Sequence, residues 1–335
     1  MVQAAAALCF ISAAGPVSAA APGNVRFTGT YASSATLAWS FGGDPMAQRP
    51  LMVLSAAPDF STAVSSAQGE LGAETTGYYG LTPNSTYFFK VKVSTDLDVF
   101  YSAPVSTITD PVPPPSPEVA GVFLSSVAVT WDGNGNAPGT YYYAEAAQDE
   151  GFTAAVVSTL TAGGGFVFED LVRNTTYYIR AWTVGFSGVE SSPASFGSTV
   201  TLSAPPLSPG YTAVYATAAA LSWSGNGNDP GNSYQVQVSS DGFQSVLYSS
   251  TAVGPAFTAY GLTPATTYYF RAAALNSAGM GSGYAVFDAT STRANIPKLH
   301  ATSTFPGGES DPADRVNIRW DKNGNPTWVE YFIGV

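Results

Sequence analysis

Three oxygen-bearing side chains alternate with glycine in the segment Thr130–Thr140, which reads TWDGNGNAPGT. Asp132, Asn134 and Asn136 have the spacing with which carboxylate and amide oxygens begin an EF-hand calcium loop. Such a loop also needs a bidentate glutamate at its twelfth position, and counted from Asp132 that position is Tyr143. The first chemistry to weigh is therefore cation binding, with one required ligand missing.

A close copy of this loop decides against a cation. The copy is SWSGNGNDPG, and it carries Ser224 where the first loop has Asp132, although copies of a ligand site should keep their ligands. A third related segment, SFGGDP after Trp39, has neither asparagine. Glycine and asparagine tolerate positive φ and suit a tight reversal of the chain. We predict a turn, with a calcium site as the less favoured alternative.

Groups for other chemistry are few. The single histidine is His300, and the single cysteine, Cys9, lies in an apolar N-terminal run. Two pairs of neighbouring carboxylates could in principle hydrolyse glycosides, but they lie in loop-like sequence without counterparts elsewhere: Asp149–Glu150 and Glu169–Asp170. The run Gly163–Gly165 lacks the lysine of a phosphate-binding loop and reads as a hairpin tip. We predict no catalytic residue, no metal site and no cofactor.

Tyrosines offer a better lead to a binding surface. In TYYYAEA, Tyr141 and Tyr143 share one face of a strand and Tyr142 takes the other, while Tyr78 and Tyr79 precede a turn. Flat tyrosines on a β surface of low charge can stack on sugar rings or anchor a protein contact. Alternatively, one member of each pair lies in the core and the other is a cross-strand partner. Tyr78, Tyr79, Tyr141 and Tyr143 are the candidate ligand contacts.

The composition indicates which elements must position these residues. The 335 residues can form two or three domains, and only 10% of them are charged, compared with about 25% in ordinary soluble proteins. With 34 glycines and 24 prolines, the chain favours short strands between turns. The net charge of −11 without basic clusters excludes nucleic acid and anionic membranes as main partners.

Two landmarks recur with one period. Four segments align on a tryptophan, at intervals of 92, 92 and 97 residues: Trp39, Trp131, Trp223 and Trp320. Three further segments, LTPNSTYFFKV, LVRNTTYYIRA and LTPATTYYFRA, align on tyrosines at intervals of 90 and 91 residues: Tyr87, Tyr177 and Tyr268. Two landmarks with the same period indicate tandem repeats.

Both landmarks have the alternation of a half-buried strand. Val127, Val129 and Trp131 alternate with smaller or polar residues, and Tyr87 shares a face with Phe89. Turn signals fall about every 8–12 residues between such runs, which is typical of an antiparallel sandwich. The expected fold class is therefore all-β.

With these landmarks the chain resembles the fibronectin type III family, which has a tryptophan on its second strand and an L-x-P-x-T-x-Y run entering its sixth. LTPATTY matches throughout, LTPNSTY has Ser85 for the threonine, and LVRNTTY has Arg173 for the proline. The resemblance covers about 22–297 and the opening of a fourth unit. It implies immunoglobulin-like β-sandwiches in which the tyrosine hydroxyl bonds back to the backbone. The core would then include Trp39, Trp131, Trp223, Trp320, Leu81, Leu171, Leu262, Tyr87, Tyr177 and Tyr268.

The predicted organisation follows from these landmarks. It consists of a signal peptide (1–21), three repeats (22–111, 112–204 and 205–297) and an incomplete fourth repeat (298–335). The linkers TDPVPPPSPEV and LSAPPLSPG are short and rich in proline, so we expect a stiff, elongated rod. The fourth repeat would be a truncation, or a half-sandwich completed by a strand of another chain.

The N-terminal residues predict export. An apolar core from Ala4 to Ala14 precedes small residues at 17–21, which is the pattern of a secretory signal peptide, although no basic residue opens it. Two formal N-glycosylation acceptors, at Asn84 and Asn174, coincide with the turn before the repeated tyrosine, where asparagine has structural reasons to occur.

These expectations combine into one functional hypothesis. The chain would be a monomeric, non-enzymatic spacer or adhesion array, secreted by a bacterium or displayed on its surface, with an unidentified protein or glycan as partner. The alternative is a carbohydrate-binding or accessory module of a secreted polysaccharide-degrading enzyme.

Overall fold

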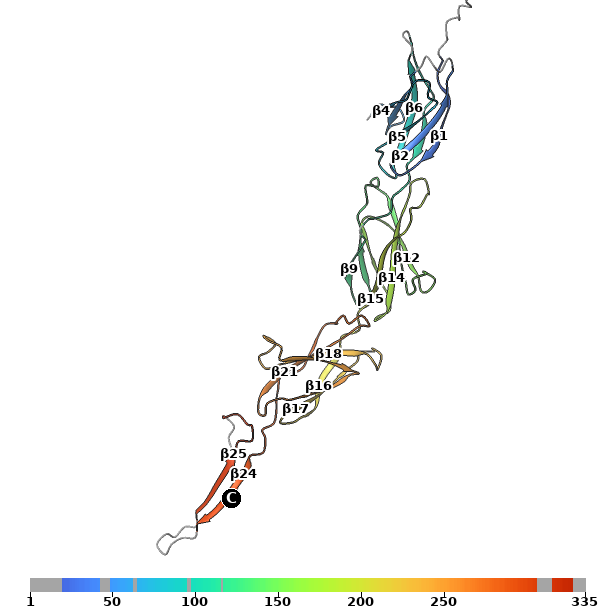
Figure 1. Cartoon of the computed structure of the whole chain (residues 1–335). Helices are drawn as coiled ribbons and strands as arrows, with labels where there is room; N and C mark the ends of the chain where they lie inside the picture. Colours follow the sequence, from blue (N-terminus) through green and yellow to red (C-terminus); the bar gives the residue numbers. More distant parts are fainter. Residues whose placement is uncertain are drawn as a thin grey trace, which may run out of the picture. The chain divides into compact units, whose positions relative to one another are not determined.

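A computed structural model describes residues 20–42, 49–62, 65–94, 98–115, 117–305 and 315–327. Every regular element in these ranges is a β-strand, and neighbouring strands pair in antiparallel sheets (Figure 1). The all-β prediction is therefore confirmed. Most of the predicted signal peptide, residues 1–19, lies outside the described ranges.

Contacts divide the chain into two compact units, and repeat 2 of the predicted organisation contributes residues to both. One comprises Met1–Val119, Val129–Phe166 and Tyr178–Gly197, and the other comprises Ala120–Ala128, Val167–Tyr177 and Ser198–Val335. We keep the names repeat 1, repeat 2 and repeat 3 for the predicted ranges 22–111, 112–204 and 205–297, and call 298–335 the fourth segment.

Repeat 1 contains two sheets with the strand orders β1-β2-β5 and β4-β3-β6-β7, and β8 pairs with β6. The first sheet consists of β1 (Gly23–Thr30), β2 (Ser34–Ser40) and β5 (Thr75–Tyr79). The second consists of β3 (Leu51–Ser55), β4 (Ser65–Gln68), β6 (Thr86–Ser94), β7 (Val99–Tyr101) and β8 (Val105–Ile108).

Repeat 2 has the same pattern, with the strand orders β13-β10-β9 and β12-β11-β14-β15. The first sheet consists of β9 (Glu118–Val122), β10 (Val127–Thr130) and β13 (Gly165–Phe168). The second consists of β11 (Tyr141–Ala147), β12 (Val157–Ala162), β14 (Thr176–Val184) and β15 (Ala194–Val200).

Repeat 3 repeats this arrangement, with the orders β16-β17-β20 and β19-β18-β21-β22, and β23 pairs with β21. Its strands are β16 (Leu207–Val214), β17 (Ala218–Ser224), β18 (Ser233–Ser239), β19 (Tyr248–Val253), β20 (Ala256–Tyr260), β21 (Thr267–Ala274), β22 (Ala285–Val286) and β23 (Thr290–Ser291). In the fourth segment, β24 (Lys298–Phe305) pairs with β25 (Arg315–Asp321).

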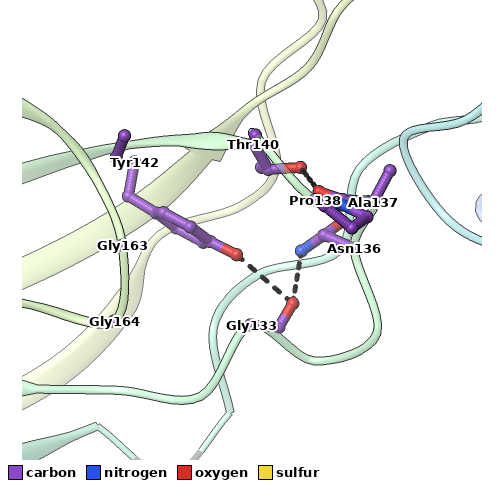
Figure 2. A pocket seen from close by; sticks show the side chains of 10 residues that line it. Gly133, Asn136, Ala137, Pro138, Thr140, Tyr142, Gly163 and Gly164 are labelled. Carbon is purple, nitrogen blue, oxygen red and sulfur yellow. Dashed lines mark hydrogen bonds between the residues drawn. The ribbon is translucent and has the colours of Figure 1, made fainter.

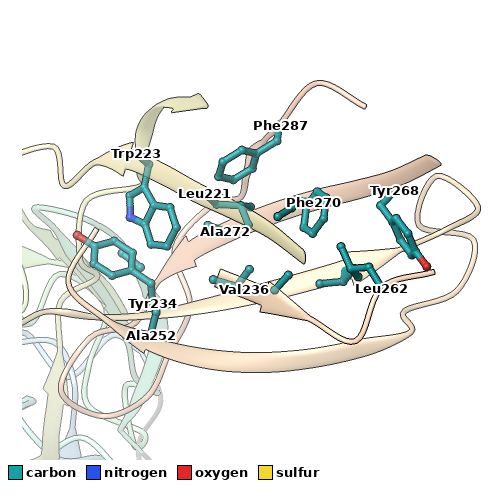
Figure 3. Close-up of a cluster of buried hydrophobic side chains, with 14 residues drawn as sticks. Leu221, Trp223, Tyr234, Val236, Ala252, Leu262, Tyr268, Phe270, Ala272 and Phe287 are labelled. Carbon is teal, nitrogen blue, oxygen red and sulfur yellow. The ribbon is translucent and has the colours of Figure 1, made fainter. Parts of the chain in front are cut away.

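The core of repeat 3 follows from the period-two alternation of its strands. Trp223 packs edge-to-face on Tyr234, with ring centroids 5.2 Å apart, and on Phe287 at 6.2 Å. Leu221 and Phe270 fill the space between the sheets, and Figure 3 shows Trp223 and Tyr268 at opposite ends of the cluster. Burying these large apolar side chains stabilises the repeat by about 1.5–3 kcal/mol each.

Most of the predicted core residues are buried. The predicted core residues that are at most 6% exposed are Trp39, Trp131, Trp223, Leu81, Leu171, Leu262, Tyr177 and Tyr268. Tyr87 is half-buried and packs against the core of repeat 1. Trp320 belongs to β25, but its side chain lies outside what the structure describes.

The three repeated tyrosines make the same backward hydrogen bond. The hydroxyl of Tyr87 accepts from the N–H of Thr82 at 2.9 Å. The hydroxyl of Tyr177 accepts from Val172, and that of Tyr268 from Thr263, both at 3.0 Å. Each bond ties the sixth strand of a repeat to the turn that precedes it, and in repeats 1 and 2 this turn also carries Asn84 or Asn174.

Candidate functional site

The loop that suggested a cation site is a turn. The carboxylate of Asp132 accepts from the N–H of Asn134 at 2.7 Å, and Asn134 and Gly135 have φ values of 52° and 73°. Only glycine and, less readily, asparagine adopt such values at low cost. The copy in repeat 3 has the same geometry at Asn226 and Gly227, with φ values of 52° and 73°.

The amide groups of this loop bind the linker that enters the same repeat. Asn136 accepts from the N–H of Val112 at 3.0 Å and donates to the Val112 carbonyl at 2.9 Å. Asn134 donates to the carbonyl of Pro113 at 2.9 Å. The oxygen of Asn136 is thus engaged by a donor, and the loop holds a peptide segment in the way a neighbouring strand would.

Repeat 3 holds its linker identically. Asn228 accepts from the N–H of Ala204 at 2.9 Å and donates to its carbonyl at 2.7 Å. Asn226 donates to the carbonyl of Pro205 at 3.0 Å. We call each such pairing of an asparagine amide with both backbone groups of one linker residue a linker clamp.

We call the place where one repeat meets the next a joint, and at each of the first two joints a second asparagine contacts the following repeat from the preceding one. Asn84, in the turn before Tyr87, is completely buried. It donates to the hydroxyl of Thr140 at 2.8 Å and accepts from the N–H of Phe186 at 2.7 Å. Because both amide atoms are engaged between repeats 1 and 2, this asparagine has no free amide for a glycan in the folded chain.

Asn174 has the same position at the joint between repeats 2 and 3. It donates to the side-chain oxygen of Asn232 at 3.3 Å and accepts from the N–H of Ser277 at 2.8 Å. The neighbouring Arg173, which replaces the proline of the resembling family, donates to the carbonyls of Asn226 and Gly227 at 3.0 and 2.9 Å. Neither the linker clamps nor these bridges were predicted from the sequence.

A hollow of about 370 Å³ lies beside the loop of repeat 2. Figure 2 shows the Tyr142 hydroxyl and the Asn136 amide both pointing at the Gly133 carbonyl, which they reach at 3.3 and 2.8 Å. Gly163 and Gly164 form another wall, and none of the lining residues is charged. A Cβ on Gly164 would lie 2.6 Å from the Trp131 carbonyl oxygen, so glycine permits a close approach of two backbones here.

The candidate tyrosines divide into two surroundings. On the outer face of the β11 sheet, Tyr141 is 48% exposed, and Tyr143 stacks on Trp182 with ring centroids 5.1 Å apart and planes 14° apart. One ring face of Tyr143 is thus occupied by a cross-strand neighbour. In repeat 1, Tyr78 packs edge-to-face on Phe89 and hydrogen bonds to Ser65, whereas Tyr79 is 77% exposed.

Each repeat also carries a cation between aromatic rings, a feature that sequence reasoning missed. The cation follows the repeated tyrosine by three residues. In each repeat it lies within 4.3 Å of the centroid of a phenylalanine ring: Lys90 with Phe60, Arg180 with Phe152, and Arg271 with Phe243. All three phenylalanines have φ between 55° and 66°. The signal was an aspartate one to three residues before a phenylalanine, followed by serine or threonine within two residues.

The aspartates of these phenylalanine turns accept several hydrogen bonds each. Bonds from the Ser245 hydroxyl and N–H lower the pKa of Asp241 to about 2. The N–H of Ala154 does most to lower the pKa of Asp149, and the Ser61 hydroxyl does most to lower that of Asp59. Asp149, weighed above as a catalytic carboxylate, therefore caps a turn as a carboxylate.

Within the described ranges, no group of three or more histidine, cysteine, aspartate or glutamate side chains could hold a metal ion. The same ranges contain no helix that is long and apolar enough to cross a membrane.

Comparison with known proteins identifies one segment directly. The sequence profile of the "Fibronectin type III domain" family matches residues 204–287, which cover most of repeat 3. A search of curated proteins found no match. Among solved structures, three domains of chicken CNTN1 (FN1–FN3) are 16% identical, covering 82% of this chain and 99% of theirs, with a TM-score of 0.31. A two-domain segment of chicken tenascin is 18% identical, covering 54% of this chain and 99% of its own, with a TM-score of 0.41.

Proposed function

We propose that the chain is a non-catalytic array of fibronectin type III repeats that serves as a spacer or adhesion segment. The observation that carries this proposal is the pair of bridging asparagines, Asn84 and Asn174, each of which engages the following repeat through both atoms of its amide. An amide bonded at both atoms opposes large rotations of one repeat against the next, because such rotations lengthen or break these bonds. Fixed joints suit a segment that holds something at a set distance.

Export to the surface of a bacterial cell, or secretion, is part of the proposal. Its support is the apolar run from Ala4 to Ala14 with small residues after it. The partner would be a protein or a glycan at the cell surface.

Small-angle X-ray scattering of the full chain tests the spacer role. We expect a monomer whose largest dimension exceeds that of a compact 335-residue globule by a factor of about two to three, since such a globule has a radius of gyration of about 20 Å. The variant with both Asn84→Ala and Asn174→Ala should scatter as a broader ensemble. A compact particle would contradict the proposal.

A second candidate function, carbohydrate binding, rests on Tyr141 beside the Tyr143–Trp182 stack. Because Tyr143 already stacks on a neighbour, the half-exposed ring of Tyr141 is the one to test. Co-sedimentation with insoluble polysaccharides should be weakened several-fold by Tyr141→Ala. Tyr260→Ala is the control, because Tyr260 is 73% exposed in repeat 3. Retention on no polysaccharide, or equal loss in both variants, would eliminate this alternative.

A further inference from the structure

The linker clamp recurs before the fourth segment. Asn325 accepts from the N–H of Asn295 at 2.6 Å and donates to its carbonyl at 2.7 Å. Asn323 donates to the carbonyl of Ile296 at 2.8 Å, as its counterparts do at the two earlier joints. The three joints therefore share the linker clamp, and at the third the side chain of Asn295 also donates to the carbonyl of Asn323 at 2.7 Å.

From the side of the preceding repeat, the third joint differs. The position of Asn84 and Asn174 is taken in repeat 3 by Ala265, which adopts the same left-handed backbone, with φ of 49° compared with 51° and 46°. The backbone contact of this turn is also preserved, because the N–H of Ala265 donates to Arg293 at 3.2 Å and that of Asn174 donates to Leu202 at 3.2 Å. The turn is intact, but a methyl group has replaced the bridging amide.

A second bridge, present at the first joint, has no counterpart among the described residues of the third joint. At the first joint, the N–H of Ala137 donates to the carbonyl of Pro83 at 3.1 Å. The residue that follows the clamp asparagine in the fourth segment is Pro326, and proline has no N–H to donate. At the second joint, Arg173 supplies the bridge instead, whereas repeat 3 has Pro264 at that position.

We propose that the joint between repeat 3 and the fourth segment is a hinge, whereas the first two joints are fixed. This inference rests on the proposed spacer function and deepens it. An array fixed at two joints and free at the third sets a distance along repeats 1–3 and lets the element after repeat 3 reorient. The linker clamp holds Asn295 to the fourth segment, and Arg293 is bonded to Ala265 and Tyr215 of repeat 3, so rotation is confined to the short linker between Arg293 and Asn295.

Distances between spin labels on the full chain test the hinge. Cys9→Ser first removes the natural cysteine. Labels on Ser158→Cys and Ser249→Cys then report the distance across the second joint, and labels on Ser249→Cys and Ser303→Cys report the distance across the third. We expect a distance distribution across the third joint at least twice as wide as that across the second. Asn174→Ala should widen the distance distribution across the second joint toward that across the third. Gln244→Ala, at an exposed position, should not.

A further label pair separates a hinge from an unfolded fourth segment. Ser303 and Asn317 are paired residues of β24 and β25, so labels there should show strong dipolar broadening. Without that broadening, the hinge proposal is wrong, because the segment would be an unstructured tail. If the distance distributions across both joints were equally narrow, the hinge proposal would be wrong and the proposed spacer function would stand. A second joint that is already wide in the unsubstituted chain would overturn the spacer itself.

Discussion

At the scale of single residues, the roles of the asparagines follow from the hydrogen-bonding groups of their side-chain amides. A carboxamide carries a donor and an acceptor in one plane and can pair with both backbone groups of another residue. Asn228 does this with Ala204, which is 1% exposed and so has no access to solvent. A buried backbone group without a partner costs about 1–3 kcal/mol, which makes the linker clamp a matter of stability as well as geometry.

Replacing Asn228 by alanine should therefore destabilise repeat 3. We expect Asn228→Ala to lower the free energy of unfolding by about 1–3 kcal/mol, because the N–H and carbonyl of Ala204 lose their partner. Urea unfolding followed by tryptophan fluorescence measures the change. Gln244→Ala, at an exposed position of the same repeat, should change stability by less than about 0.5 kcal/mol. Equal effects of the two variants would show that the clamp is dispensable.

The hydroxyl of Tyr268 makes a second residue-scale prediction. Tyr268→Phe keeps the ring in the core and removes only the acceptor of the Thr263 N–H, so stability should fall by about 1 kcal/mol. The control is Tyr260→Phe, since the Tyr260 side chain is 73% exposed. Both variants are compared by denaturant unfolding, and a loss for Tyr260→Phe that matched the loss for Tyr268→Phe would rule out a specific role of the corner.

At the scale of elements, one turn recurs in all three repeats: the phenylalanine turn, which contains Phe60, Phe152 or Phe243. An aspartate accepts the N–H groups of the turn, a phenylalanine with positive φ projects its ring, and the cation of the sixth strand stacks on that ring. A positive φ is unfavourable for phenylalanine. The cation–π contact, worth about 0.5–2 kcal/mol, and the aspartate bonds offset that strain.

Because of the aspartates in these turns, we expect the free energy of unfolding to fall at acidic pH. The folded pKa of Asp241 is about 2, below its ordinary value of 3.8. Its contribution is therefore present at pH above about 4 and is lost as the pH falls through 2. Urea unfolding at pH 7, 4 and 2 should show stability falling more steeply between pH 4 and 2 for the unsubstituted chain than for Asp241→Asn. Parallel curves would contradict the assignment, and an NMR titration of Asp241 checks the pKa directly.

Some features of the fold could be predicted from the sequence, and others could not. Strand alternation and the tryptophan and tyrosine landmarks predicted an all-β chain, because these signals are local and repeat within each sandwich. The roles of Asn84 and Asn174 could not be predicted, since their partners Phe186 and Ser277 lie more than 100 residues away and meet them only when two repeats are packed. Tyr143 was predicted as a candidate contact, but its partner Trp182 depends on strand register, which the sequence alone left undetermined.

At the scale of the whole molecule, the joints decide whether repeats unfold together. The stability of a tandem array is the sum of the stabilities of its repeats and of the interfaces between neighbours. The bridges of Asn84 and Asn174 are such interface contributions, because each joins groups from two successive repeats. Removing one bridge should therefore change how unfolding is shared between repeats more than it changes the core of any repeat.

Asn174→Ala is the variant that isolates this coupling. It removes the bonds to Asn232 and to the Ser277 N–H, so repeats 2 and 3 should unfold less cooperatively, and the calorimetric transition should broaden or split. Asn228→Ala has a different expected signature, because its clamp lies between repeat 3 and its own linker: the transition of repeat 3 should shift to lower temperature with little broadening. If both variants shifted the melting temperature alone, the joints would carry no coupling, and the repeats would be independent units on a chain.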